Sequence, residues 1–118
     1  MIFDNPLFII PILTGPLVII IMLITLKYPP KKVNSLYGYR TKRSMVSQEA
    51  WDFAQPYSGK LMIRYMIIYT LTASLAVPMK DLNMIVGVFL SILTMILFMA
   101  IPIIKTEKEL KARFENRN

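Results

Sequence analysis

The residues best suited to recognise a ligand lie close together, in a short segment of the 118-residue chain. This segment offers an amide, a phenol, a guanidinium and a hydroxyl, on Asn34, Tyr39, Arg40 and Thr41. The guanidinium of arginine presents donors in a fixed plane and binds carboxylates and phosphates through charge-assisted hydrogen bonds. We therefore predict that these residues form one polar cluster that binds an anionic headgroup, a peptide carboxylate or a partner protein.

The same segment also has structural interpretations that the sequence leaves open. Arg40 can bind lipid phosphate or cap the end of a helix, and Asn34 can satisfy backbone groups of the loop. Gly38 lies between two tyrosines and is predicted to occupy a turn of positive φ or to allow a close backbone approach. Ser44 or Ser47 is predicted to cap a following helix.

Candidates for catalytic chemistry are few. The chain contains no histidine and no cysteine, which removes the usual general base, the thiolate nucleophile and the commonest metal ligands. Glu49 and Asp52 are three residues apart on a predicted helix, but the surrounding basic residues favour salt bridges over an acid–base or metal-binding pair. We therefore predict no enzymatic activity, no catalytic residue, no metal site and no cofactor.

Helices must position these polar residues, because three apolar segments dominate the chain, at residues 7–26, 61–77 and 82–104. Hydrophobic residues make up 55% of the sequence, and the mean hydropathy is +0.51. A bilayer core of about 30 Å needs about 20 apolar residues in a helix, and helices satisfy their own backbone groups in lipid. The sequence predicts an all-α polytopic membrane domain over residues 1–118, with three transmembrane helices.

The distribution of charge predicts the orientation of these spans. Residues 27–64 contain eight basic and two acidic residues, a net charge of +6, and the tail of residues 105–118 contains five basic and three acidic residues, a net charge of +2. Positive charge beside membrane spans accumulates in the cytoplasm. We predict a cytoplasmic loop at residues 27–60, a cytoplasmic tail and an external N-terminus. Anionic lipid headgroups, rather than nucleic acid, are the expected partner of this charge.

Several features of the helices follow from local sequence. A short amphipathic helix, at about residues 47–55, is predicted to lie on the membrane with Trp51 as its anchor, and Pro56 to end or kink it. Pro11 and the run Thr14-Gly15-Pro16 are predicted to kink the first span or to break its hydrogen-bond ladder locally. Arg64, one turn inside the second span, is expected to reach the interface, or alternatively to bind an anionic group.

Small residues and the tail supply further expectations. The faces around Ser74 and Ser91 are predicted to meet, because small residues allow close approach of helices in lipid.

Residues 105–117 are predicted to form a solvated or interface-lying helix, with a partner-binding helix as the alternative. Glu107 with Lys111, and Glu109 with Arg113, are spaced as salt bridges along that helix. The acidic start of the chain argues against a signal peptide.

A set of residues in the loop resembles the signature of the SdpI-like membrane protein family. These residues are Asn34, Gly38-Tyr39-Arg40-Thr41, Ser44-Met45, Ser47, Glu49, Trp51 and Gly59. The chain resembles the compact members of that family, small multi-span bacterial proteins with this loop between their first two spans. The best-known member protects a toxin-producing bacterium from its own membrane-active peptide and sequesters a repressor at the membrane.

The resemblance implies a role in immunity to, or sensing of, a membrane-active peptide toxin in the bacterial cytoplasmic membrane. It further implies a peptide toxin or a membrane or regulatory protein as partner. An accessory subunit of a membrane complex is the alternative, and a small oligomeric transporter ranks lower because no span carries a deep ionisable residue. Homo-oligomerisation stays open. Asn34, Gly38, Tyr39, Arg40, Thr41, Ser44, Trp51 and Arg64 are the predicted binding residues.

Overall fold

The computed structural model describes residues 2–115, which consist of helices joined by loops and turns. Its elements are η1 (Ile2–Asp4), α1 (Pro6–Lys27), α2 (Gln48–Leu71), η2 (Thr72–Ala76), α3 (Met84–Leu110) and a final π-helical turn, η3 (Lys111–Glu115). No strand occurs among these residues. The all-α prediction is therefore confirmed for the described chain.

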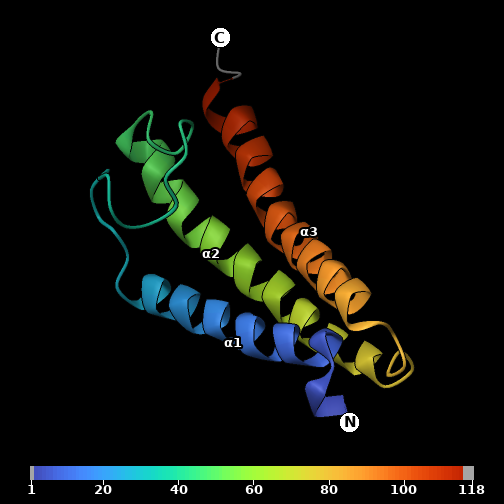
Figure 1. The fold of residues 1–118 in the computed structure, drawn as a ribbon. Helices are drawn as coiled ribbons and strands as arrows, with labels where there is room; N and C mark the ends of the chain where they lie inside the picture. The colour runs from blue at the N-terminus through green and yellow to red at the C-terminus, as the bar shows by residue number, and fades with distance from the viewer. Residues whose placement is uncertain (1, 116–118) are drawn as a thin grey trace.

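The helices form an elongated bundle with two distinct ends. Figure 1 shows α2 between α1 and α3, with the start of α1 beside the turn that joins η2 to α3. The loop of residues 28–47 lies at the opposite end, near the C-terminal end of α3. The side-chain amide of Asn5 donates a hydrogen bond of 3.2 Å to the carbonyl of Met79. This bond joins the start of α1 to the turn between η2 and α3.

Helix α1 begins where the sequence predicts and continues through both of its internal prolines. The side chain of Asn5 accepts a hydrogen bond from the backbone of Leu7, and proline follows at the first helical position. Neither Pro11 nor Pro16 ends the helix, so their predicted effect is at most a local one on its course or its hydrogen-bond ladder. Contacts with neighbouring helices hold prolines inside membrane helices, and here Pro11 and Gly15 are both buried against the bundle.

Helix α2 corrects the prediction of a separate interfacial helix. One helix runs from Gln48 to Leu71, and Pro56 lies inside it without ending it. Ser47 caps this helix, since its hydroxyl accepts a hydrogen bond of 3.0 Å from the backbone of Ala50. The residues expected to lie on the membrane therefore form the first turns of the central helix.

Helix α3 corrects the prediction of a solvated tail. The helix continues from the apolar segment to Leu110, and the side chains of Thr106 and Leu110 are fully buried. At 1.5 Å per residue its 27 residues extend about 40 Å, more than a bilayer core requires. The polar end of α3 therefore projects beyond the apolar segment and packs against the rest of the protein.

The close contacts between helices differ from the predicted meeting of Ser74 with Ser91. Ser91 is buried, but Ser74 is exposed, so that prediction is wrong. Ser74 belongs to the 3₁₀ segment η2, whose tighter winding rotates side chains relative to an α-helix. A close approach at a small residue joins α1 to α2 instead, where a Cβ added at Gly15 would collide with the hydroxyl of Thr70.

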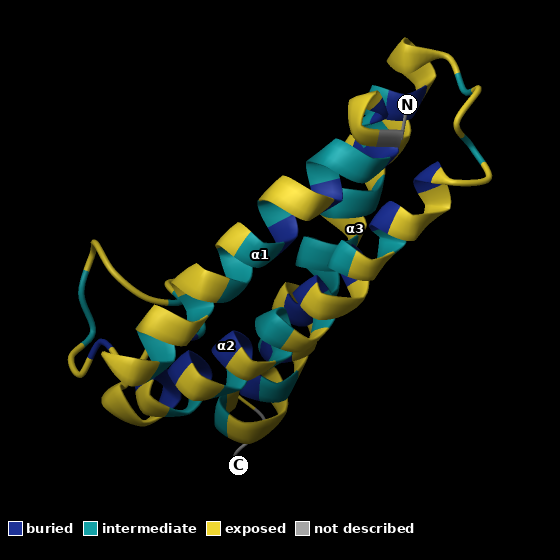
Figure 2. Cartoon of the chain, turned by 90° about the horizontal axis from the view of Figure 1, so that it is seen from below, coloured by how far each residue is buried: buried dark blue, intermediate teal, exposed yellow. Residues whose placement is uncertain are grey.

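Two of the described helices are long and apolar enough to cross a membrane, α1 and α3 with its continuation to Glu115. Much of their apolar surface is uncovered by the protein, as the exposed stretches in Figure 2 show. Large exposed apolar surfaces are rare on soluble monomers and mark contact with a membrane or a partner. This surface is the pattern expected of helices that face lipid.

Candidate functional site

The loop of residues 28–47 has a defined conformation that begins at Asn34. The side-chain oxygen of Asn34 accepts hydrogen bonds from the backbone of Leu36 at 2.9 Å and of Tyr37 at 2.7 Å. This asparagine turn leads into Gly38, whose φ is +109°. The predicted positive φ of Gly38 is confirmed, and the side chain of Asn34 satisfies backbone groups of the loop, as one of its two interpretations requires.

Gln55 of α2 fixes the backbone of the loop. Its side-chain oxygen accepts a hydrogen bond of 2.7 Å from the Tyr39 amide, and its nitrogen donates one of 3.0 Å to the Tyr39 carbonyl. A Cβ added at Gly38 would lie 2.7 Å from the Gln55 oxygen and 2.6 Å from Pro30. Glycine is therefore required at this position by conformation and by space together.

The loop meets the polar end of α3 at Glu107. One carboxylate oxygen, Oε2, accepts hydrogen bonds from the hydroxyls of Tyr39 at 2.8 Å and Thr41 at 2.9 Å. The other oxygen lies 3.7 Å from the guanidinium of Arg43. We call the set Tyr39, Thr41, Arg43 and Glu107 the loop–α3 junction. It joins segments more than 60 residues apart and sets the position of the loop relative to α3.

The electrostatics of the junction keep the Tyr39 hydroxyl protonated. Burial raises the pKa of Tyr39 well above its usual value, and the hydrogen bond to the negatively charged Glu107 raises it further. A neutral phenol can donate to the carboxylate, whereas a phenolate would repel it. Arg43 also forms an ion pair with Glu115, with 2.9 Å between Nε and Oε1 but without hydrogen-bond alignment.

Apolar packing beneath the loop overturns the prediction that Trp51 anchors the protein in a membrane interface. The Trp51 side chain is fully buried, and its indole nitrogen donates a hydrogen bond of 2.6 Å to the carbonyl of Pro30. Next to it, Ala50 and Ala54 of α2 pack against Leu110 of α3. Trp51 therefore holds the loop onto α2, and the end of α3 is part of the core.

The structure brings together only part of the predicted polar cluster. Tyr39 and Thr41 meet at Glu107, whereas Arg40 is exposed and donates a hydrogen bond of 2.6 Å to the carbonyl of Ser35. Ser44 is fully buried and is not the cap of α2, because its hydroxyl lies within the loop and donates to the carbonyl of Tyr39.

Arg64 of α2 is exposed and does not take part in the junction. The residues of the candidate site that the sequence did not indicate are Glu107 and Arg43 of the junction and Gln55, which holds the loop. Glu107 was paired with Lys111 by helical spacing, while Glu109 forms its predicted pair with Arg113 at 2.8 Å. The one signal that could have drawn attention to Gln55 is its polar side chain between the alanine and proline of Ala54-Gln55-Pro56, in the first half of α2.

Comparison with known proteins places the chain in a family. Residues 31–106 match the SdpI/YfhL protein family, a range that includes most of the junction and the segments around it. An uncharacterised protein of Bacillus subtilis (strain 168), YfhL, is 38% identical over 100 residues, which cover 82% of this chain and 82% of the relative. No solved structure matches. The protein is a member of the SdpI/YfhL family of membrane proteins.

Proposed function

We propose that the chain crosses the bacterial cytoplasmic membrane three times, through α1, residues 61–77 and α3. Residues 61–77 comprise the apolar half of α2 and η2, where Ile67, Leu71 and Leu75 are exposed to the surroundings. The Asn5–Met79 hydrogen bond puts the N-terminus and the η2–α3 turn at one end of the bundle. The basic loop and the end of α3 lie at the other, so the positive-inside rule favours an external N-terminus and a cytoplasmic loop.

We further propose that the protein protects the cell against a membrane-active peptide toxin, or senses one. Membership of the SdpI/YfhL family supports this role. The observation that carries it is the loop–α3 junction, because two hydroxyls that donate to one carboxylate hold the motif-bearing loop in a single position. A fixed loop pays less conformational entropy on binding than a mobile one.

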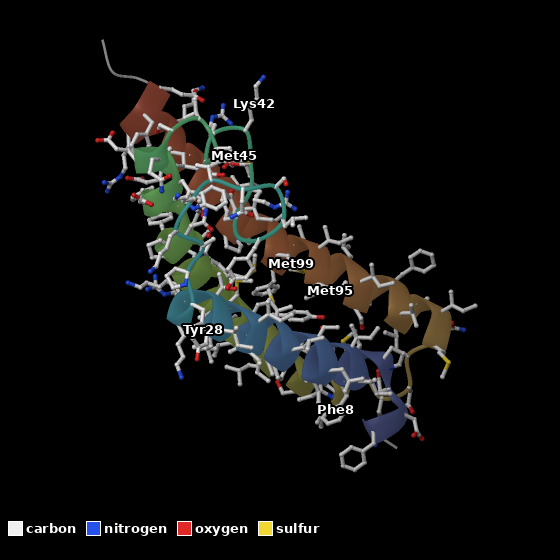
Figure 3. All side chains as sticks on the ribbon, turned by 90° about the vertical axis from the view of Figure 1, so that its left-hand side faces the viewer. Phe8, Tyr28, Lys42, Met45, Met95 and Met99 are labelled. Atoms are coloured by element: carbon white, nitrogen blue, oxygen red, sulfur yellow. The ribbon has the colours of Figure 1, made fainter. Side chains whose placement is uncertain are left out.

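The exposed side of this loop is the proposed recognition surface. Arg40 is oriented by its bond to Ser35, and Lys42 lies in the same loop, at the end of the bundle reached by the C-terminal part of α3 (Figure 3). Guanidinium and ammonium groups suit a peptide carboxylate, an acidic segment of a regulatory protein or an anionic headgroup. Two copies of the protein could also associate through the exposed apolar faces of their helices and leave this recognition surface uncovered.

Survival of a toxin-sensitive bacterium tests the proposal. Cells would express wild type, Arg40→Ala or Glu107→Ala at matched membrane levels and be challenged with a panel of membrane-active peptides. We expect protection by wild type, and its loss in both variants. Glu109→Ala is the matched control, because Glu109 pairs only within the helical end with Arg113 and does not reach the loop.

Two results would contradict the proposal in different ways. Protection that survives in both Arg40→Ala and Glu107→Ala would remove the loop from the mechanism. Failure of wild type to protect against any peptide, together with copurification of a stoichiometric partner protein, would replace immunity with a role as an accessory subunit.

A further inference from the structure

A largely apolar cavity of about 300 Å³ lies under the loop and is bounded by all three helices. Met22 of α1, Met62 of α2 and Ile103 of α3 contribute its apolar walls. The segment Tyr37-Gly38-Tyr39 covers it, and Gln55, which holds that segment, also borders it. The cavity therefore lies at the boundary between the membrane-spanning part of the bundle and the loop.

We propose that this cavity binds one acyl chain of an anionic phospholipid. Both helices that are apolar enough to span a membrane, α1 and α3, line it, so lipid chains surround its walls. Figure 3 shows Met99, one helical turn before Ile103, in the space between α3 and α1. Small-molecule sites begin at about 300 Å³, which suits a single chain and not a whole lipid.

The charge of the loop around the cavity favours an anionic headgroup. A second cavity, of about 310 Å³, shares Thr25 and Gln55 with the first. Its lining includes one basic residue, Lys31, and one acidic residue, Asp52, so the excess of positive charge comes from the wider loop. Residues 27–64 carry a net charge of +6, from eight basic and two acidic residues. Basic pockets between transmembrane helices bind anionic headgroups, so a phosphate near Lys31 with its chain under the loop fits this arrangement.

The bilayer is a more suitable source of this occupant than a peptide. Lipid is present in large excess around α1 and α3, and a site that contacts it is filled by mass action. The bound chain would contact the underside of Tyr37-Gly38-Tyr39 and so stabilise the same loop that the junction holds. This inference requires the membrane location of the protein but not its role in immunity.

Native mass spectrometry of the purified, delipidated full chain tests the inference. The protein would be titrated with phosphatidylglycerol or with phosphatidylcholine of the same chain length. We expect one phosphatidylglycerol to be retained, with an affinity at least tenfold above that for phosphatidylcholine. Lys31→Gln should reduce this preference, because it removes the nearest positive charge that lines the paired cavities.

A cavity-filling variant separates this site from general lipid contact. Ile103→Trp should abolish retention of the lipid, whereas Ile104→Trp, on an exposed face of α3 outside the cavity, should retain it as wild type does. Met22→Trp with Leu23→Trp as control provides a second pair on α1 in case one variant does not fold, and circular dichroism verifies helix content. The melting temperature of each variant would also be measured with and without phosphatidylglycerol.

The outcomes are distinct. Retention of phosphatidylglycerol by folded Ile103→Trp and Met22→Trp at wild-type strength would overturn the cavity as the site. Equal affinity for the two lipids would overturn the anionic headgroup. Binding of a membrane-active peptide in place of lipid, lost in the same variants, would overturn lipid as the occupant. None of these readouts uses protection from a toxin, so their failure is separable from failure of the proposed function.

Discussion

Replacement of Gly38 by alanine tests whether the conformation of the loop depends on this one residue. The φ of +109° disfavours residues with a side chain, and left-handed backbone costs about 1–2 kcal/mol for an L-residue. The new Cβ would lie 2.7 Å from the Gln55 oxygen, which displaces the two Gln55–Tyr39 hydrogen bonds at about 0.5–1.5 kcal/mol each. The total is a loss of about 2–5 kcal/mol in the stability of the loop.

The fluorescence of Trp51 provides the assay. It is the one tryptophan in the chain, and its indole is buried and bonded to Pro30 at the base of the loop. Denaturant titration of the protein in micelles would give the free energy of the transition that exposes it. We expect Gly38→Ala to expose Trp51 at a lower denaturant concentration than wild type does. In this variant, the helix content measured by circular dichroism should persist to a higher denaturant concentration than the one that exposes Trp51.

A second glycine supplies the control for that experiment. A Cβ at Gly87 would meet Pro6 at no less than 3.5 Å, an ordinary van der Waals contact, and helix formation favours alanine over glycine by about 1 kcal/mol. Gly87→Ala should therefore be neutral or stabilising. A Gly38→Ala protein whose transition lies within about 0.5 kcal/mol of wild type, the range of ordinary surface substitutions, would refute the reasoning.

Three further predictions concern the helices and the junction. Gly15→Ala should separate α1 from α2, because its Cβ would collide with the Thr70 hydroxyl; loss of a disulfide crosslink between cysteines introduced on the two helices would detect this. Asn5→Ala should lower the melting temperature, measured by calorimetry against wild type, because it removes about 1 kcal/mol of helix capping and also the hydrogen bond to Met79. The fold raises the pKa of Tyr39, so its contribution to stability should be complete below pH 10, the ordinary tyrosine value, and decline as the pH rises beyond it. Stability measured from pH 8 to pH 11.5 should therefore fall less in Tyr39→Phe than in wild type, and parallel curves would contradict the assigned bond to Glu107.

The local part of the architecture was accessible from the sequence. Ser47 and Gly38 indicated a helix cap and a positive φ, because each feature depends on neighbours within a few residues. The apolar segments likewise indicated helices. Such signals act over a single turn, so no knowledge of the fold is needed to interpret them.

The contacts between segments far apart in the chain could not be predicted from the sequence, as Glu107 and Trp51 show. Helical spacing suggested Lys111 as the partner of Glu107, but two hydroxyls from a loop more than 60 residues away compete successfully for its carboxylate. Trp51 has the pattern of an interfacial anchor until the Pro30 segment covers it. Periodicity describes one helix at a time, and it cannot report which segment will cover its face.

The length of α3 has a mechanical consequence. Its 27 residues extend about 40 Å from Met84, and Glu107 lies close to the far end. A membrane helix answers a change in bilayer thickness by changing its tilt. A slight rotation of α3 about its Met84 end would therefore produce its largest displacement at Glu107. There, Tyr39 is held to α2 through Gln55 and to α3 through its hydroxyl. The thickness of the surrounding bilayer would then be expressed as strain on the two hydrogen bonds that Tyr39 and Thr41 donate to Glu107.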